Sequence, residues 1–413
     1  MLIRWLVSSF ARPDQVSFPI CAVKRRSLYG AGTRIRWAGV LDWGLMMRTI
    51  AMWVAVVVTM IAPVCAQTTV VRAARMVDVV SGRVVAPAVV VVEGERIRAV
   101  NPAVVPGGAA VVDLGDVTLV PGFHDMHVHI LEPDGTTYRR AMVAEEAGYG
   151  LLRSLKNAEQ MLMAGFTTVR ELGQLQVTRE LLAVSMGKAG DAGWIAAPRI
   201  TAAGHAITIT GGHIDPDMQA AIVPGLFRLG PEIGVANGVD EVTRAVREQI
   251  KAGARVIKIS ATAGVMSVED SVGAQQMTDA EIRAAVEEAG RHGLKVAAHA
   301  HGAEGILAAV KAGVASIEHG SMLTEESIAL MKQRGTYLVP TTHLADTIDL
   351  TGAPAVVKQK ADAVLPVARA SVRKAALAGV KIALGTDAPL EACGENAKEF
   401  GAMEARGMTA AEA

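Results

Sequence analysis

Hydrophobic and polar positions follow two different patterns along this chain. Short β-rich runs, among them Ala88 to Val92, fill residues 68–120. Turn signals separate these runs at Ser81-Gly82, Glu93-Gly94 and Pro106-Gly107-Gly108. Glycine and proline at such points end strands and reverse the chain. The pattern predicts a small antiparallel sheet that precedes the main domain.

After residue 120 the pattern predicts a helix, then a glycine, then a strand, and this unit repeats. Helical spacing of apolar positions alternates with short apolar runs that are typical of buried strands. The predicted helices are 151–164, 181–188, 239–252, 279–292, 303–312, 324–334 and 361–378. The predicted strands begin with one at Phe123 and continue with 166–170, 199–203, 255–260, 295–299, 315–320, 337–341 and 381–387. Thr278 and Glu281 predict a reciprocal capping box at the start of the fourth helix.

Repeated helix–glycine–strand units predict a parallel sheet, and eight of them predict a closed (β/α)8 barrel of the TIM type. The predicted fold class is therefore α/β, with the barrel at residues 121–413. A doubly wound open sheet is the alternative, but no Gly-x-Gly-x-x-Gly follows an early strand. Residues 67–120 are interpreted as part of a small β-sandwich domain formed from the N-terminal strands.

The first 66 residues carry a signal of a different kind. Met47-Arg48 precedes an apolar run from Ile50 to Ile61, and small residues follow as far as Ala66. A positive start, a short apolar run and small residues at the end predict a secretory signal peptide at 46–66. A membrane span is disfavoured, because the run is shorter than the ~20 apolar residues that a span needs. We expect a periplasmic or secreted protein without a stable membrane span after cleavage. Residues 1–45 are interpreted as a misassigned start.

The composition of the chain disfavours nucleic acid as a binding partner. The 413 residues include 41 basic and 41 acidic ones, so the formal net charge is zero and no basic stripe favours nucleic acid. Apolar residues make up 51% and aromatic residues 4%, which suits buried strands rich in valine and alanine. The expected partner is a small molecule or a dipeptide, and assembly as a homo-oligomer is left open.

Chemically capable side chains gather at the predicted strand ends, where barrels of this type place their function. His127 and His129 are two residues apart on the first strand, so both imidazoles point to one side. The other strand ends add four residues: Lys258, His299, His319 and Asp387. Each alone would be an ordinary core or surface residue, but their shared placement predicts a metal site.

The motifs around these residues resemble those of the amidohydrolase superfamily, metal-dependent hydrolases with a distorted (β/α)8 barrel. The motifs are Pro121-Gly122-Phe123-His124-Asp125-Met126-His127-Val128-His129, Ile257-Lys258-Ile259, Ala298-His299-Ala300-His301-Gly302, Ile317-Glu318-His319-Gly320 and Gly385-Thr386-Asp387-Ala388. Three further runs are similar to the branch that contains imidazolonepropionase-like proteins and the Xaa-Pro or Xaa-Arg dipeptidases. They are Thr210-Gly211-Gly212-His213, Gly264-Val265-Met266-Ser267 and Gly394-Glu395-Asn396-Ala397. The likeness runs from about Thr68 to the end, and Ala263 departs from it where the branch has glycine.

The resemblance implies a centre of two divalent metal ions, with zinc as the first choice. The implied ligands are His127, His129 and Asp387 for one ion and His299 and His319 for the other. Lys258 would bridge the two ions as a carbamate formed with CO2. Chemistry supports this role, because a lysine desolvated among aliphatic neighbours loses its proton readily. Such a site also accepts Mn, Co or Ni.

The implied activity is hydrolysis of an amide or peptide bond, as in dipeptidases of the Xaa-Pro or Xaa-Arg type. Water activated by the metals would attack the carbonyl, and Asp387 would move the proton from the water to the leaving amine. His213 and His343 follow the third and seventh strands and are candidates for substrate contact. Arg170 is expected to form a structural salt bridge. Three further histidines receive no role: His124, His205 and His301.

The sequence disfavours two other functions. A cyclic-amide hydrolase of the imidazolonepropionase type is expected in the cytosol with one metal, so the export signal and Lys258 disfavour it. A non-catalytic barrel relative would have lost ligands, whereas all six positions are filled here. The chain stops in what resembles a helix start after the eighth strand. We therefore interpret the barrel as truncated at its C-terminus, with the remaining sandwich strands missing.

Overall fold

The computed structural model describes residues 68–133, 145–220, 229–268 and 271–413. The chain divides into two compact units, Met1–Val120 and Pro121–Ala413, and each is described by itself. The predicted signal peptide and the segment before it lie outside the described residues. Within the described ranges, no helix is both long enough and apolar enough to cross a membrane.

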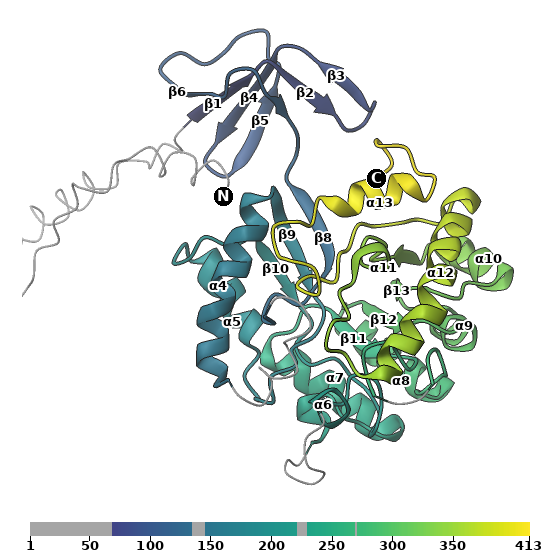
Figure 1. Ribbon diagram of the computed structural model, residues 1–413. Helices are drawn as coiled ribbons and strands as arrows, with labels where there is room; N and C mark the ends of the chain where they lie inside the picture. The colour runs from purple at the N-terminus through teal and green to yellow at the C-terminus, as the bar shows by residue number, and fades with distance from the viewer. Residues whose placement is uncertain (1–67, 134–144, 221–228, 269–270) are drawn as a thin grey trace, which may run out of the picture. The chain divides into compact units, whose positions relative to one another are not determined.

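The described part of the first unit consists of short strands (Figure 1). These are β1 (Thr68–Ala73), β2 (Arg75–Asp78), β3 (Arg83–Val85), β4 (Ala88–Glu93), β5 (Arg96–Val100), β6 (Ala110–Asp113) and β7 (Thr118–Leu119). They form two sheets, ordered β5-β4-β1-β6 and β3-β2-β7. β4 pairs antiparallel with β1 and β5, and β2 pairs antiparallel with β3, as predicted, but β6 joins β1 and β7 joins β2 in parallel. The prediction of a wholly antiparallel sheet was wrong because these strands return after long connections, which permit parallel pairing.

The second unit contains parallel strands that carry most of the predicted chemistry. These are β8 (Phe123–Val128), β9 (Phe166–Glu171), β10 (Arg199–Ala202), β11 (Ile257–Ser260), β12 (Val296–Ala300), β13 (Ser316–His319) and β14 (Tyr337–Val339). They form the sheets β10-β9-β8 and β11-β12-β13-β14. Every residue of β11, β12 and β13 is buried, as expected for parallel strands that are covered on both faces.

Helices surround these strands (Figure 1). The helices are α4 (Ala147–Met163), α5 (Leu182–Asp191), α6 (Pro216–Ala220), the 3-10 turn η2 (Pro231–Ile233), α7 (Gly238–Ala252), α8 (Asp279–Arg291), α9 (Ala303–Ala312), α10 (Glu325–Arg334), α11 (Leu344–Thr347), α12 (Ala355–Ala378) and α13 (Lys398–Ala405). The predicted capping box is confirmed, because Thr278 accepts from the Glu281 amide and the Glu281 carboxylate accepts from the Thr278 amide. Helix α9 ends at Gly313 with φ +96°, which lets the chain turn directly into β13.

The predicted eighth strand does not form a regular strand. Backbone hydrogen bonds tie its residues to β14 on one side (Leu338 N to Lys381 O, 2.8 Å) and to β8 on the other (Met126 N to Leu384 O, 2.9 Å). At its end, Asp387 has φ +62°, a left-handed conformation outside the extended region. Isolated bridges rather than continuous ladders join the two sheets. The described residues therefore do not form one closed eight-stranded barrel.

The core of the second unit lies where helices cover the strands. Its largest cluster combines β11 to β14 with α7 to α10, and includes Ile257, Ile259, Ile282 and Ile317. A second cluster joins β8 and β9 to α4 and α5. Because the strands of each sheet are parallel, their carboxyl ends lie at one edge of that sheet. This arrangement positions the site described next.

Candidate active site

The first group of candidate ligands lies at the end of β8. His127 Nε2 and His129 Nε2 are each 3.2 Å from Asp387 Oδ1. The Asp387 amide donates to the His127 carbonyl at 2.7 Å, so backbone pairing with β8 holds the carboxylate against both rings. The ligand atoms of all three residues lie within 4.8 Å of one another. The structure therefore brings together the three residues that the resemblance assigned to one ion.

The protonation states of the side chains in this group are compatible with a bound cation. His129 Nδ1 lies 2.9 Å from the Gly173 carbonyl oxygen, which can only accept, so Nδ1 donates. In the neutral ring Nε2 then presents a lone pair to Asp387 Oδ1, and two acceptors in contact need a shared proton or a metal ion. Burial raises the pKa of Asp387, but in the absence of a metal ion protonated rings of His127 and His129 would hold it well below its usual range. The group thus fits a divalent cation.

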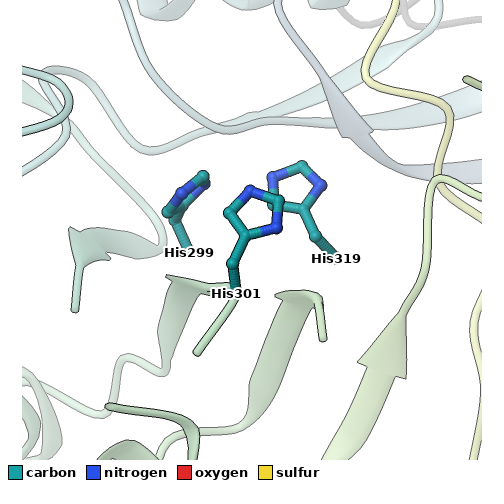
Figure 2. Close-up of side chains that lie close together, drawn as sticks. All are labelled: His299, His301 and His319. Atoms are coloured by element: carbon teal, nitrogen blue, oxygen red, sulfur yellow. The ribbon is translucent and has the colours of Figure 1, made fainter. Parts of the chain in front are cut away.

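The second group consists of three histidines at the carboxyl ends of β12 and β13, with His301 directly after β12 (Figure 2). His299, His301 and His319 place one ring nitrogen each within 4.8 Å of the others. His301 Nδ1 lies 2.7 Å from Ser321 Oγ, and His319 Nδ1 lies 2.9 Å from Thr341 Oγ1. His299 Nε2 is buried and has no hydrogen-bond partner among the described residues.

These three rings are uncharged at neutral pH. Burial and repulsion from neighbouring histidines lower the pKa of His299 and of His319 well below the usual value. The same causes lower the pKa of His301 to about 3. Neutral imidazole is the form that binds a metal ion. A buried ring nitrogen without a partner, next to two more neutral rings, fits a metal cation.

His301 was given no role from the sequence, yet it completes the second group. The available signal was its spacing from His299, which equals the spacing of His127 from His129. Residues i and i+2 of a strand point to the same side, so the reasoning used for the first pair also applies to the second.

Lys258 lies beside both groups. It is 1% exposed on β11, and its Nζ is 3.5 Å from His127 Nε2. Burial lowers the pKa of Lys258 to about 8, although the charges of Glu318 and Asp387 oppose the shift. Its charge also lowers the pKa of His299 and of His319. A fraction of Lys258 is therefore a free amine near neutral pH.

Glu318 is a residue that the sequence reasoning missed. This fully buried carboxylate accepts from Arg170 Nη2 at 2.9 Å and from Ser316 Oγ at 2.5 Å, and it lies 2.9 Å from His127 Nδ1. Burial alone would raise the pKa of Glu318, but Arg170 and His127 lower it to about 2. Glu318 therefore fixes the proton of His127 on Nδ1. Arg170 forms the structural salt bridge that was predicted.

Asp125 ties the two halves of the first group together. Its carboxylate accepts from Thr386 Oγ1 and Asn396 Nδ2, both at 2.7 Å, and from the His127 amide at 3.1 Å. Gly385, next to Thr386, lets this segment lie close to β8, because a Cβ on Gly385 would lie 2.9 Å from His127 Cβ. The segment that carries Asp387 is thus held against β8 by side-chain as well as backbone bonds.

The other predicted histidines fall in different places. His213 stacks on His299 with ring centroids 4.4 Å apart and places Nδ1 2.5 Å from Ser267 Oγ. His343 is not among the described residues that line the cavity, since its ring is turned to Glu391 Oε2 at 2.7 Å. Of the histidines without a predicted role, His124 is exposed and His205 bonds the Thr178 carbonyl at 2.7 Å.

The two groups open onto a cavity of about 150 Å³. His213 lines it together with both groups and Lys258. Most of the remaining wall is apolar and includes Leu175, Val265, Met266, Leu344, Val364, Leu365 and Leu390. An apolar cavity with a few convergent polar groups is the usual form of a small-molecule site.

Glu132 also lines this cavity. It is 3% exposed, and its Oε1 accepts from Gln176 Nε2 at 3.2 Å. Its Oε2 is buried and has no hydrogen-bond partner among the described residues. Burial raises the pKa of Glu132 to about 7. Burial raises the pKa of the neighbouring Glu171 to about 7 as well, and repulsion from Glu132 adds to that shift.

Residues 118–413 match the sequence model of the Amidohydrolase family. Ochratoxinase from Aspergillus niger is 36% identical over 313 residues, which cover 71% of this chain and 63% of that protein. The chain therefore spans less than two thirds of the length of this curated relative.

Solved structures agree with the family match. A Xaa-Pro dipeptidase with methionine bound in its active site gives a TM-score of 0.77 and 38% identity, covering 84% of this chain and 85% of that one. A prolidase complexed with N-methylphosphonate-L-proline gives 0.70 and 32%, covering 83% and 86%. These matches confirm the predicted superfamily and an α/β fold like that of TIM-barrel proteins, while the branch stays a prediction.

Proposed function

Because the chain belongs to the amidohydrolase family, we propose that it is a metal-dependent hydrolase that cleaves an amide or peptide bond. One observation carries this proposal: two groups of possible metal ligands, each with histidines, line the same cavity beside Lys258. In one of these groups Asp387 Oδ1 is in contact with His127 and His129. Neutral nitrogens and one carboxylate that converge in a buried pocket are what a hydrolytic metal centre requires.

We assign the two groups to two divalent ions, with zinc as the first choice. The proposed ligands are His127, His129 and Asp387 for one ion, and His299 and His319, now joined by His301, for the other. Lys258, as a carbamate, would contribute oxygen ligands to both. When bound, the ions would lower the pKa of a water molecule and polarise the substrate carbonyl.

The protein's own groups then orient and move protons. Glu318 and the Gly173 carbonyl hold His127 and His129 with Nδ1 protonated, so both Nε2 atoms stay available as ligands. Asp387 is ionised and uses Oδ1 toward the histidines. We assign to its Oδ2 the transfer of a proton from the attacking water to the leaving amine.

The substrate that we propose is a dipeptide of the Xaa-Pro type. Apolar residues such as Leu365 and Met266 line the cavity and suit an apolar substrate better than an arginine side chain. Two similar solved structures, one a Xaa-Pro dipeptidase and one a prolidase, carry methionine and a proline derivative respectively. Both observations support an Xaa-Pro substrate over the Xaa-Arg alternative.

Substitution of Asp387 by asparagine tests the proposal. With the proton acceptor removed, kcat for an Xaa-Pro dipeptide should fall by about 100- to 10,000-fold. Hydrolysis is measured by amino acid release, and metal content by elemental analysis of the same samples. Wild-type protein should hold two metal ions per chain. Fewer than two ions together with no amide hydrolysis, or near-normal activity of Asp387→Asn, would contradict the assignment.

We also propose that the protein is exported to the periplasm or the medium. The support is the sequence pattern of residues 46–66 alone. N-terminal sequencing of the exported protein should find Gln67 as the first residue. A mature chain that begins within residues 1–45 would contradict both the signal peptide and the reassigned start.

A further inference from the structure

We propose that Glu132 is a specificity residue that binds a positively charged nitrogen of the substrate through its Oε2 atom. This inference rests on the proposed function and names the charge that the cavity selects. It follows from three features of Glu132, which are its place in the cavity wall, its burial and its unused oxygen.

The charge of the cavity wall is the first argument. Of the described residues that line the cavity, the ones with acidic or basic side chains other than histidine are Glu132, Lys258 and Asp387. Lys258 and Asp387 belong to the proposed metal centre. Glu132 is thus the one acidic side chain of this described lining that is left for the substrate. Its neighbours in the wall include the apolar Leu175 and Pro133.

The hydrogen bonding of Glu132 is the second argument. Its Oε1 accepts from Gln176 Nε2 at 3.2 Å and faces the Leu175 amide at 3.4 Å. Its Oε2 is buried and has no partner in the described part of the chain. An unsatisfied buried polar atom costs about 1–3 kcal/mol, so such atoms usually have a functional reason. A donor that arrives with the substrate would satisfy this oxygen.

The position of Glu132 relative to the reacting centre is the third argument. Its amide donates to the His129 carbonyl at 3.0 Å, so it lies in the turn directly after a proposed ligand. In a dipeptide the α-ammonium is two bonds from the scissile carbonyl carbon. A group placed next to His129 is therefore suited to meet a charge close to that carbonyl, and a charge-assisted bond strengthens in a buried site.

A substrate nitrogen with a positive charge has two sources, the α-ammonium of a dipeptide or the side chain of lysine or arginine. The two are separated by three probes: Leu-Pro, N-acetyl-Leu-Pro and N-acetyl-Leu-Lys. Leu-Pro carries only the α-ammonium, N-acetyl-Leu-Lys carries only the side-chain cation, and N-acetyl-Leu-Pro carries neither.

The test compares kcat/KM for the three probes between wild type and Glu132→Gln, which keeps the size of the side chain. The loss on one cationic probe should exceed the loss on N-acetyl-Leu-Pro by about 10- to 100-fold. A selective loss on Leu-Pro identifies the α-ammonium, and one on N-acetyl-Leu-Lys identifies the side chain. Equal losses on all three probes, or no loss on any, would overturn the inference.

Binding of leucinamide and N-acetyl-leucinamide, measured by calorimetry, separates this inference from the proposed function, because binding needs no turnover. A wild type that hydrolyses none of the probes contradicts the function alone. If Glu132→Gln then weakens leucinamide, or N-acetyl-lysinamide measured in the same way, more than N-acetyl-leucinamide, the inference stands. If it weakens all three equally or none of them, the inference fails.

Glu146→Gln is the matched control, because Glu146 is exposed at the start of α4 and makes no side-chain capping bond. It should keep the wild-type ratios between probes. Thermal melting and metal content of Glu132→Gln establish that the fold and the metal centre are intact. If this variant does not fold, Glu132→Asp takes its place, because it keeps the carboxylate but moves it away from the substrate by one methylene group. The same kcat/KM ratios between the probes are then compared.

Discussion

At the scale of single residues, the candidate site depends on which nitrogen of each ring carries the proton. His127 is oriented by Glu318, and His129 by the Gly173 carbonyl. His319 is held through Thr341 in the same manner. Partners of this kind fix the tautomer and the ring direction, and their loss typically costs about 10- to 100-fold in metal affinity.

Glu318→Gln should therefore weaken metal binding without removing a ligand. The amide keeps the shape of the side chain but lacks the charge that holds the proton on His127 Nδ1. Metal affinity should fall by about 10- to 100-fold, measured by competition with a chelator of known affinity. Glu326→Gln, at an exposed position 3.5 Å from Lys311, is the control and should not change affinity. Unchanged affinity in a folded Glu318→Gln protein would contradict the role assigned to Glu318.

Residues near each other in sequence could be placed in advance, and residues far apart could not. The spacing of His127 and His129 predicted that their rings share one side, because alternation along a strand is a local property. The contact between His127 and Glu318 joins residues 191 positions apart. It depends on how β13 is placed relative to β8, and no local pattern encodes that placement.

At the scale of elements, local signals predicted helices better than strand ends. The capping box of α8 formed as expected because both of its bonds lie within four residues. Helix α12 begins at Ala355, ahead of the predicted start, since Pro354 is compatible with a helix start. The predicted eighth strand forms only isolated bridges, at Ile382 and Ala388, and Asp387 takes a left-handed conformation at the site. Side-chain periodicity carries no signal for that conformation.

Helices α7 and α8 are linked by Glu288, which provides a test by pH. Glu288 accepts from Arg247 and Arg291, each at 2.6 Å, and the Arg247 bond is the main cause that lowers its pKa to about 2. A carboxyl whose pKa is lowered on folding adds stability above its unfolded pKa, here about 4.5, and loses it as pH falls toward 2. Both arginines are mostly exposed, so the gain is on the order of 1 kcal/mol.

Glu288→Gln should accordingly lower the free energy of unfolding by about 1 kcal/mol at pH 7. The difference from wild type should shrink as the pH falls below 4.5 toward 2. Urea titrations at several pH values measure it, and Glu287→Gln, 3.8 Å from Arg291 on the exposed face, serves as control. A difference that stays constant or grows in acid would show that the link does not act through the carboxylate charge.

At the scale of the whole second unit, the proposed ligands come from segments that are widely separated along the chain. His129 follows β8, and Asp387 lies in the segment that pairs with β8 and β14. The others lie on three further strands, Lys258 on β11, His299 on β12 and His319 on β13, so the ligands meet only in the folded state. An unfolded chain cannot present these groups together, so metal binding should add directly to stability. Because isolated bridges rather than ladders join the two sheets, two ions that share the Lys258 carbamate would strengthen a junction with few backbone bonds.

Removal of metal should therefore destabilise this unit strongly. At free zinc one hundredfold above the dissociation constant, each site adds about 2.7 kcal/mol to the free energy of unfolding. Urea unfolding with and without a chelator measures the change, and zinc added back should restore it. His299→Ala should lose the part of the shift that belongs to one site, whereas His124→Ala, at an exposed position, should keep all of it. An unfolding midpoint that does not respond to chelation would contradict the assignment of these histidines as metal ligands.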